Sequence, residues 1–128
     1  MIQVFGSKAI VYLKHNGGLK SLAKIVSEGL VLPEFYFESD MDPPHQISAL
    51  CETLGFEIWI EKSDILEDFP FVIKIESKLS FEESFNNQMY DLSPWLARYI
   101  SKICEIDSCI YDELEKSYIK LTKGIFIT

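Results

Sequence analysis

The sequence predicts an α+β domain, with a mostly antiparallel sheet of four or more strands and three or four helices packed on it. Three observations predict this class. Several short segments alternate apolar and polar residues with the period of two that is typical of strands. Other segments carry helix start signals followed by apolar residues three and four positions apart. The length of 128 residues, 48% of them hydrophobic, suits one core, so we expect residues 1–128 to form a single globular domain.

The first third of the chain is predicted to hold β structure and one helix. Residues 2–5 and 8–14 are rich in β-forming side chains, with a short glycine-containing turn between them. Apolar residues at helical spacing follow over residues 19–26, and Gly29 stands where this helix would end. Residues 34–38 alternate as a strand does.

The clearest helix signal lies next. Asp42 is a favourable N-cap, and Pro43 suits the first helical position. Apolar residues then recur at helical spacing, and Gly55 marks the end of the predicted helix. The predicted apolar stripe consists of Ile47, Leu50, Cys51 and Leu54.

Two strands are predicted after this helix, over residues 56–61 and 71–76, because both segments alternate. The polar connection between them, from Lys62 to Pro70, is too short for a helical crossover, so we expect the strands to be antiparallel neighbours. In that pairing Lys74 would lie across from a glutamate of the first strand, Glu57 or Glu61.

The last third is predicted to be largely helical. A capping box at Ser80–Glu83 indicates a short helix that ends near Met89. Ser93 and the proline after it indicate a second helix, which has an apolar face, and residues 109–116 suggest a third. Two short strands are expected at the C-terminal end, over residues 118–121 and 125–127.

Composition restricts the classes of function. No apolar run approaches the roughly 20 residues that span a bilayer, and the N-terminal sequence lacks the pattern of a signal peptide, so we expect a cytoplasmic protein with no membrane partner. The net charge is −8, and all 20 acidic residues lie within residues 28–115. This acidic middle would repel nucleic acid and suits a basic protein partner, although such charge also serves solubility.

The sequence carries no motif for nucleotide binding, metal binding or catalysis. The histidines, His15 and His45, have no ligand-like spacing to other residues, and we expect them to be surface or packing residues. The cysteines are too few and too irregularly spaced for a disulfide framework, a redox motif or a zinc site, so we expect buried thiols. We therefore expect no cofactor, no metal and no catalytic activity.

Two features are candidates for contact with a partner. Trp59 lies between two glutamates on the polar face of its predicted strand; it would be core if a helix covers that face and an interface anchor if none does. We expect it to be core. The connection from Ser63 to Asp68 carries three acids and two apolar residues, which suits either a binding loop or a solvated turn.

In size, acidic middle, α+β pattern and lack of a catalytic motif, the chain resembles the small immunity proteins of bacterial contact-dependent growth inhibition; the stretch DMDPPHQISALCETLGFEIWIEKS is similar in style to them. The resemblance implies an immunity protein that binds and neutralises a cognate toxin domain, often a basic nuclease, through carboxylates that pair with toxin cations. The expected contacts are Asp64, Glu67, Asp68, Asp112, Glu113 and Glu115, with Trp59 as a conditional addition. The alternatives are a non-catalytic adaptor or regulatory subunit, and a small enzyme with a scattered histidine, cysteine and carboxylate site.

Overall fold

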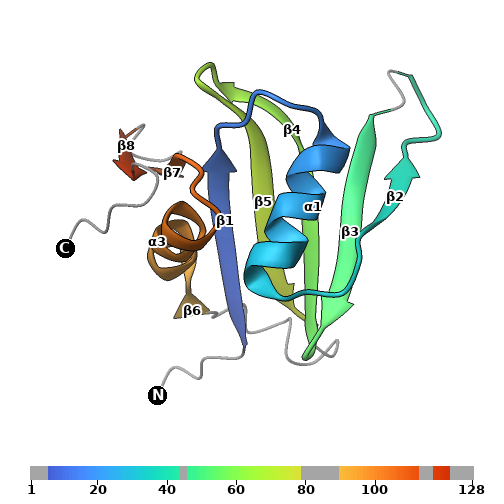
Figure 1. Ribbon diagram of the computed structural model, residues 1–128, viewed down its shortest axis with the longest axis horizontal. Helices are drawn as coiled ribbons and strands as arrows, with labels where there is room; N and C mark the ends of the chain where they lie inside the picture. Colours follow the sequence, from blue (N-terminus) through green and yellow to red (C-terminus); the bar gives the residue numbers. More distant parts are fainter. Residues whose placement is uncertain (1–5, 44–45, 79–89, 113–116, 122–128) are drawn as a thin grey trace.

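The computed structural model describes residues 6–43, 46–78, 90–112 and 117–121. An eight-stranded sheet dominates it; seven strands follow the order β2-β3-β4-β5-β1-β7-β8, and β6 pairs with β1 (Figure 1). The pairings are antiparallel except for the short parallel one between β6 and β1. The strands are β1 (Ser7–Leu13), β2 (Tyr36–Ser39), β3 (Ile47–Thr53), β4 (Phe56–Leu66), β5 (Phe69–Ser77), β6 (Tyr90–Asp91), β7 (Ser108–Asp112) and β8 (Ser117–Leu121).

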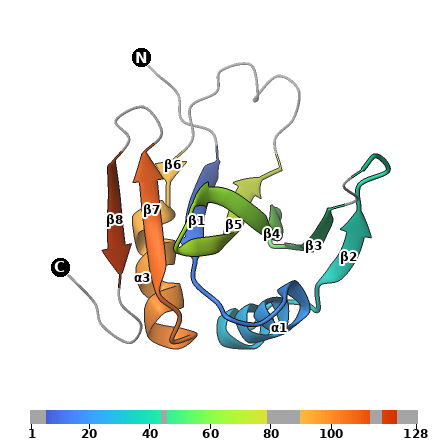
Figure 2. The same ribbon diagram turned by 90° about the horizontal axis from the view of Figure 1, so that it is seen from above.

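The described residues contain two helices, α1 (Leu19–Leu30) and α3 (Ser93–Ile103), and both pack on the same face of the sheet (Figure 2). The apolar stripe of α1, which includes Leu22 and Val26, is buried against this face. Leu96 does the same for α3. Neither of these helices is both long and apolar enough to span a membrane.

The main core lies between the two helices and the sheet face that they cover. Successive side chains of a strand point to opposite faces, so every second residue enters this core. Val11, Ile60 and Ile73, one from each of the three central strands, have no exposed surface. Burying an aliphatic side chain of this size contributes roughly 1.5–3 kcal/mol. The residues between them necessarily point to the opposite face, which no described helix covers.

One end of that opposite face is packed by the sheet itself. Tyr12, Phe69, Val72 and Cys109 form a second, smaller buried cluster, and Leu66 packs against its edge. This cluster joins the end of the β4–β5 hairpin to β1 and β7. The rest of the opposite face, over β2, β3, β4, β5 and β1, has no such cover from the described residues; we call it the open face.

The helix predicted to start at Asp42 is wrong, because its apolar stripe lies in strand β3. The apolar residues fit a helical spacing, but Ala49 and Cys51 also alternate toward the core as a strand requires. Strands β2 and β4 pair with both edges of β3, and this tertiary pairing overrides the local signal. A two-residue turn, Leu54 and Gly55, joins β3 to β4 with both residues at positive φ, as in a type I′ hairpin.

Two further expectations also prove wrong. The segment predicted as a helix over 109–116 starts as strand β7, whose Cys109 pairs with Tyr12 of β1. The expected polar connection from Lys62 to Pro70 is mostly strand, since β4 runs to Leu66 and β5 begins at Phe69, with an irregularity in register after Lys62. The predicted class, with three or four packed helices, therefore needs correction to a dominant antiparallel sheet with two helices in the described residues.

The other element predictions agree with the structure where it describes them. The strand predicted over 8–14 is β1, those over 34–38, 56–61 and 71–76 correspond to β2, β4 and β5, and the strand over 118–121 is β8. The helices expected after the Asn-Gly-Gly turn and at the Ser-Pro pair are α1 and α3. The predicted strands over 2–5 and 125–127, and the capping-box helix near 80–89, lie outside the described residues.

Candidate functional site

The open face carries a row of large side chains that crosses five strands. In the register of the sheet, Tyr36, Leu50, Trp59, Lys74 and Ile10 lie directly opposite one another from β2 to β1. We call these five residues the central row. Tyr36 and Ile10 are 49% and 40% exposed, and Leu50 and Trp59 are half-buried. Trp59 therefore lies in the middle of an apolar strip that water reaches.

Acidic residues flank the central row on both sides. On one side Glu38 and Glu61 lie in the next row of the register, with Ser48 between them. On the other side Glu57 of β4 lies directly between two further glutamates. The row on this second side consists of Glu52, Glu57, Glu76 and Lys8. Like charges placed directly opposite in a sheet repel each other, so this arrangement costs stability.

Two lysines partly neutralise these carboxylates. The expectation that Lys74 lies across from Glu57 or Glu61 is wrong, because Lys74 is directly opposite Trp59 in the register. Its Nζ instead reaches Glu61 Oε1 diagonally, at 3.2 Å. Lys78 donates a hydrogen bond to Glu52, and this bond, aided by the charges of Glu52 and Glu57, raises the pKa of Lys78. Exposed ion pairs of this kind contribute little to stability, because water screens them, and they leave much of the negative field in place.

A hollow of about 320 Å³ opens beside Trp59 at the β2 end of the central row. Trp59 and Leu50 supply apolar surface, and Glu38, Asp40 and Glu57 supply carboxylates. Aromatic faces attract cations, and carboxylates form charge-assisted hydrogen bonds with guanidinium and ammonium groups. The hollow thus suits a cationic side chain of a partner.

The predicted contact residues do not gather into one site. Trp59 is at the centre of the open face, because no described helix covers it, and the expectation that it would be core is wrong. Asp64 is exposed near the end of β4 and lines a different hollow, and Glu67 and Asp68 form the exposed turn between β4 and β5. Asp112 is the last residue of β7, whereas Glu113 and Glu115 lie outside the described residues.

Sequence reasoning missed most of the open-face acids. Glu38, Glu52 and Glu76 come from three strands that are far apart in the sequence, and only the strand order and register place them on one face. The alternation of β4 was a usable signal, since it put Glu57 and Glu61 on the same side as Trp59.

His15 is the described histidine, and its ring makes a hydrogen bond with Ser21. His15 Nε2 lies 2.8 Å from Ser21 Oγ, and Ser21 Oγ donates its hydrogen to the carbonyl oxygen of Gly18 at 2.9 Å. Because Ser21 has one hydroxyl hydrogen, His15 must donate to it. A general base would have to accept that hydrogen, so this contact stabilises the start of α1 rather than activating Ser21. His45 lies outside the described residues.

The cysteines are free thiols in protected surroundings. Cys51 and Cys109 are buried, and Cys104 is half-buried. Burial raises the pKa of Cys51, with a smaller contribution from the charge of Glu52, and burial raises the pKa of Cys104. Both thiols are therefore protonated and poorly nucleophilic near neutral pH. Within the described ranges, no three His, Cys, Asp or Glu side chains are grouped as metal ligands would be.

These features give the open face the chemistry of a contact surface: a half-buried tryptophan, exposed apolar neighbours and surrounding carboxylates. Comparison with known proteins adds no assignment to this geometry. No protein-family model matches the chain, and neither does any curated protein or solved structure.

Proposed function

We propose that this chain is a binding protein that captures a basic protein domain on its open face and neutralises it. The observation that carries the proposal is the central row: four large apolar or aromatic side chains and Lys74 aligned across five strands, with Trp59 in the middle and glutamates in the rows on both sides. Interfaces of this kind place aromatic anchors at the centre and charged residues at the rim.

Trp59 is the expected energetic centre of the complex. It is half-buried in the free protein and lies between Leu50 and Lys74 in the register, so ordering it on binding costs less than ordering a fully exposed side chain. Truncation of a central tryptophan typically weakens binding by 2 kcal/mol or more, roughly 30-fold in the dissociation constant.

The carboxylates supply attraction and selectivity. Glu52, Glu57 and Glu76 face one another although they repel, which is a local cost that a positively charged partner would relieve. A basic domain would be attracted over a distance of about 10 Å at moderate salt and would approach faster than a neutral one. An acidic domain would be repelled.

The resemblance to immunity proteins makes a toxin domain the proposed partner. A nuclease-type toxin presents lysines and arginines where the substrate phosphates bind, and carboxylates can occupy the same positions. The glutamates of the open face supply such groups on a rigid sheet. The alternative is an adaptor that binds a basic domain without inhibiting it.

The test is affinity capture with tagged protein at low and high salt, using three forms of the chain: native, Trp59→Ala and Trp95→Ala. Trp95 is a matched control, because it is 57% exposed on α3 and stacks on Tyr99 instead of joining the open face. We expect the native form and Trp95→Ala to capture the same basic protein, with recovery reduced at high salt, and Trp59→Ala to lose it. Circular dichroism of each variant confirms folding.

The captured domain is then assayed for its own activity with and without this protein. Inhibition supports neutralisation, and binding without inhibition supports the adaptor alternative. Equal capture by Trp59→Ala and the native protein would assign the contact to another surface and overturn the proposed site.

A further inference from the structure

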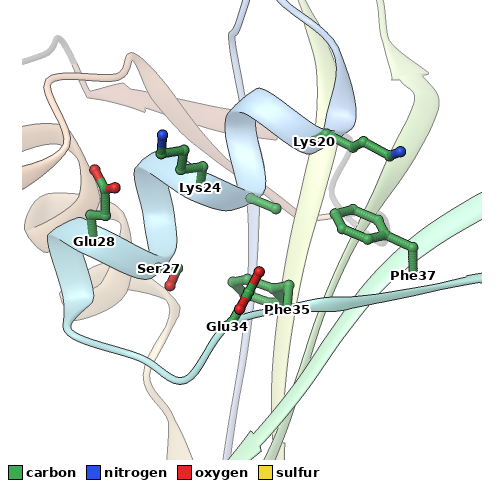
Figure 3. A pocket seen from close by; sticks show the side chains of 8 residues that line it. Lys20, Lys24, Ser27, Glu28, Glu34, Phe35 and Phe37 are labelled. Carbon is green, nitrogen blue, oxygen red and sulfur yellow. The ribbon is translucent and has the colours of Figure 1, made fainter.

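A second surface of the molecule lies on the helix side of the sheet, between α1 and strand β2 (Figure 3). It is a groove of about 450 Å³, which we call the α1–β2 groove. Lys20 and Phe37 lie at one end of the groove, Glu28 lies at the other, and Lys24, Phe35 and Glu34 lie between them (Figure 3). The lining residues are Lys20, Ala23, Lys24, Ser27, Glu28, Glu34, Phe35 and Phe37.

Strand β2 is the edge of the described sheet at this groove, and no other described strand pairs with the outer side of its backbone. The amide of Asp40 donates to the carbonyl of Gln46 at 2.9 Å, which fixes which residues face β3. Because bonding directions alternate along an antiparallel strand, Tyr36 and Glu38 also face β3, and the amides and carbonyls of Phe37 and Ser39 point outward. These outward groups are spaced as an added strand requires.

The floor of the groove is aromatic. Phe35 is buried in the main core, and Phe37, two residues later on the same side of the chain, is 38% exposed. Among the residues of α1 that line the groove, Ala23 has the smallest side chain, which leaves room above the rings. An extended chain beside β2 would direct alternate side chains toward this floor.

Lysines line the helix side of the groove. Lys20 Nζ lies 5.6 Å from the centre of the Phe37 ring (Figure 3), and Lys24 lies one helical turn further along α1. Neither lysine forms an ion pair with a carboxylate of the described residues. Glu28 lies one further turn along α1, away from Lys20, and Glu34 lies beside Phe35 on the other side of the groove (Figure 3), so the charge is positive at the Lys20 end and becomes negative toward Glu28.

We propose that the α1–β2 groove binds an extended peptide segment that pairs with the outer edge of β2 and places an acidic side chain beside Lys20 and Lys24. Hydrogen bonds between the backbones of the peptide and β2 align the peptide along the strand. The phenylalanine floor contacts an apolar side chain of the peptide, and the lysines select an acidic one. This goes beyond the function proposed above, because the groove is on the other face of the sheet and prefers the opposite charge. A basic domain bound to the open face would not occupy the α1–β2 groove.

The test uses a capped hexapeptide, acetyl-Thr-Glu-Thr-Val-Thr-Val-amide, titrated into the full chain and followed by NMR of the backbone amides. The alternating sequence places Glu and Val on one side of the strand. We expect saturable shifts at the amides of Phe37 and Ser39, and at least tenfold weaker binding of a probe with Lys in place of Glu. Two further probes are N-methylated at alternate amides, one at the odd and one at the even positions. In one of them the methyl groups replace the amide hydrogens that would pair with β2, and that probe should not bind.

Ser39→Pro removes one outward amide and leaves the bonds to β3 intact, since proline is tolerated on an edge strand where its nitrogen faces solvent. Ser39→Ala keeps the amide and is the matched control. We expect Ser39→Pro to weaken probe binding at least tenfold and Ser39→Ala to leave it unchanged. In Lys20→Glu with Lys24→Glu, the preference should reverse toward the Lys probe.

Trp59→Ala separates this proposal from the function proposed above, because it alters the open face and should not change probe binding. Amide chemical-shift changes confined to residues away from β2 and α1, or equal binding of both N-methylated probes, would overturn the proposed peptide site in the groove. Self-association of the native chain that Ser39→Pro abolishes would also overturn it, by making a second copy the occupant of the edge.

Discussion

At the scale of single residues, the open face is built at a cost to stability. Glu57 lies directly between Glu52 and Glu76 in the register, and of these three only Glu52 forms a described ion pair, with Lys78. A strand selected for stability alone would alternate charges at these positions. The repulsion is the residue-level signature expected where a surface is kept for binding.

Glu57→Gln tests this. Removing the central charge relieves two repulsions, so we expect the free energy of unfolding to rise by about 0.5 kcal/mol. The same change should slow association with a basic partner. Chemical denaturation measures the first effect and stopped-flow mixing the second. Glu67→Gln, in the β4–β5 turn, is the matched control and should not change stability. A fall in stability on Glu57→Gln would contradict the repulsion.

The sequence alone could place Trp59 but not decide its role. Alternation correctly put Trp59, Glu57 and Glu61 on one face of β4. Whether a helix covers that face depends on which segments are helices. The segment that contains Leu50 was predicted as a helix, but it is strand β3 and contributes Leu50 to the open face. The wrong prediction for Trp59 thus followed from the error in the preceding element, β3.

At the scale of elements, β3 shows why local signals failed. Its apolar positions fit both a helical and a strand period, and a good N-cap at Asp42 favoured the helix. The decisive feature was the turn after it, where Leu54 at φ 51 precedes Gly55 at φ 81. Leucine is unusual in the left-handed region, so the hairpin signal that asparagine would have given was missing.

The Leu54 turn gives a prediction with opposite outcomes for two substitutions. Leu54 is 92% exposed, so changing it removes little packing. Leu54→Asn should raise the free energy of unfolding by roughly 0.5–1 kcal/mol, because asparagine tolerates positive φ, and Leu54→Val should lower it by a similar amount or more. Thermal unfolding of both variants checks the sign. Equal stability of the two would show that residue 54 does not adopt this conformation.

The contact of α1 with α3 gives a second prediction at this scale. Gly29 lies in the last turn of α1, one residue before the helix ends at Leu30, close to the predicted end. A Cβ at this position would be 2.5 Å from Cys104 Sγ. Gly29→Ala should destabilise the native protein by about 1–3 kcal/mol through overpacking. In a Cys104→Ala background the same change should stabilise by up to about 1 kcal/mol, because alanine favours helix. Identical effects in both backgrounds would exclude this contact.

At the scale of the whole molecule, strand order creates the surfaces. β1 lies between β5 and β7, so the first strand of the described residues completes the central row with Ile10. The two described helices occupy one face, which leaves the other face for the acidic rows and puts the α1–β2 groove, with its lysines, on the helix side. The sequence shows that the chain is acidic, but the strand register was needed to show which face of the sheet carries the acidic residues.

The division of charge predicts how a complex on the open face would respond to salt and to mutation. If a basic domain docks there, the glutamates act mainly before contact, and Trp59 acts after it. Raising salt from about 0.05 to 0.5 M shortens the screening length several-fold, so the association rate should fall at least tenfold with little change in dissociation. Trp59→Ala should do the reverse and speed dissociation. Surface plasmon resonance with the captured partner measures both rates. If salt changed dissociation alone, the charges would belong to the bonded interface, and steering by the glutamate rows would be excluded.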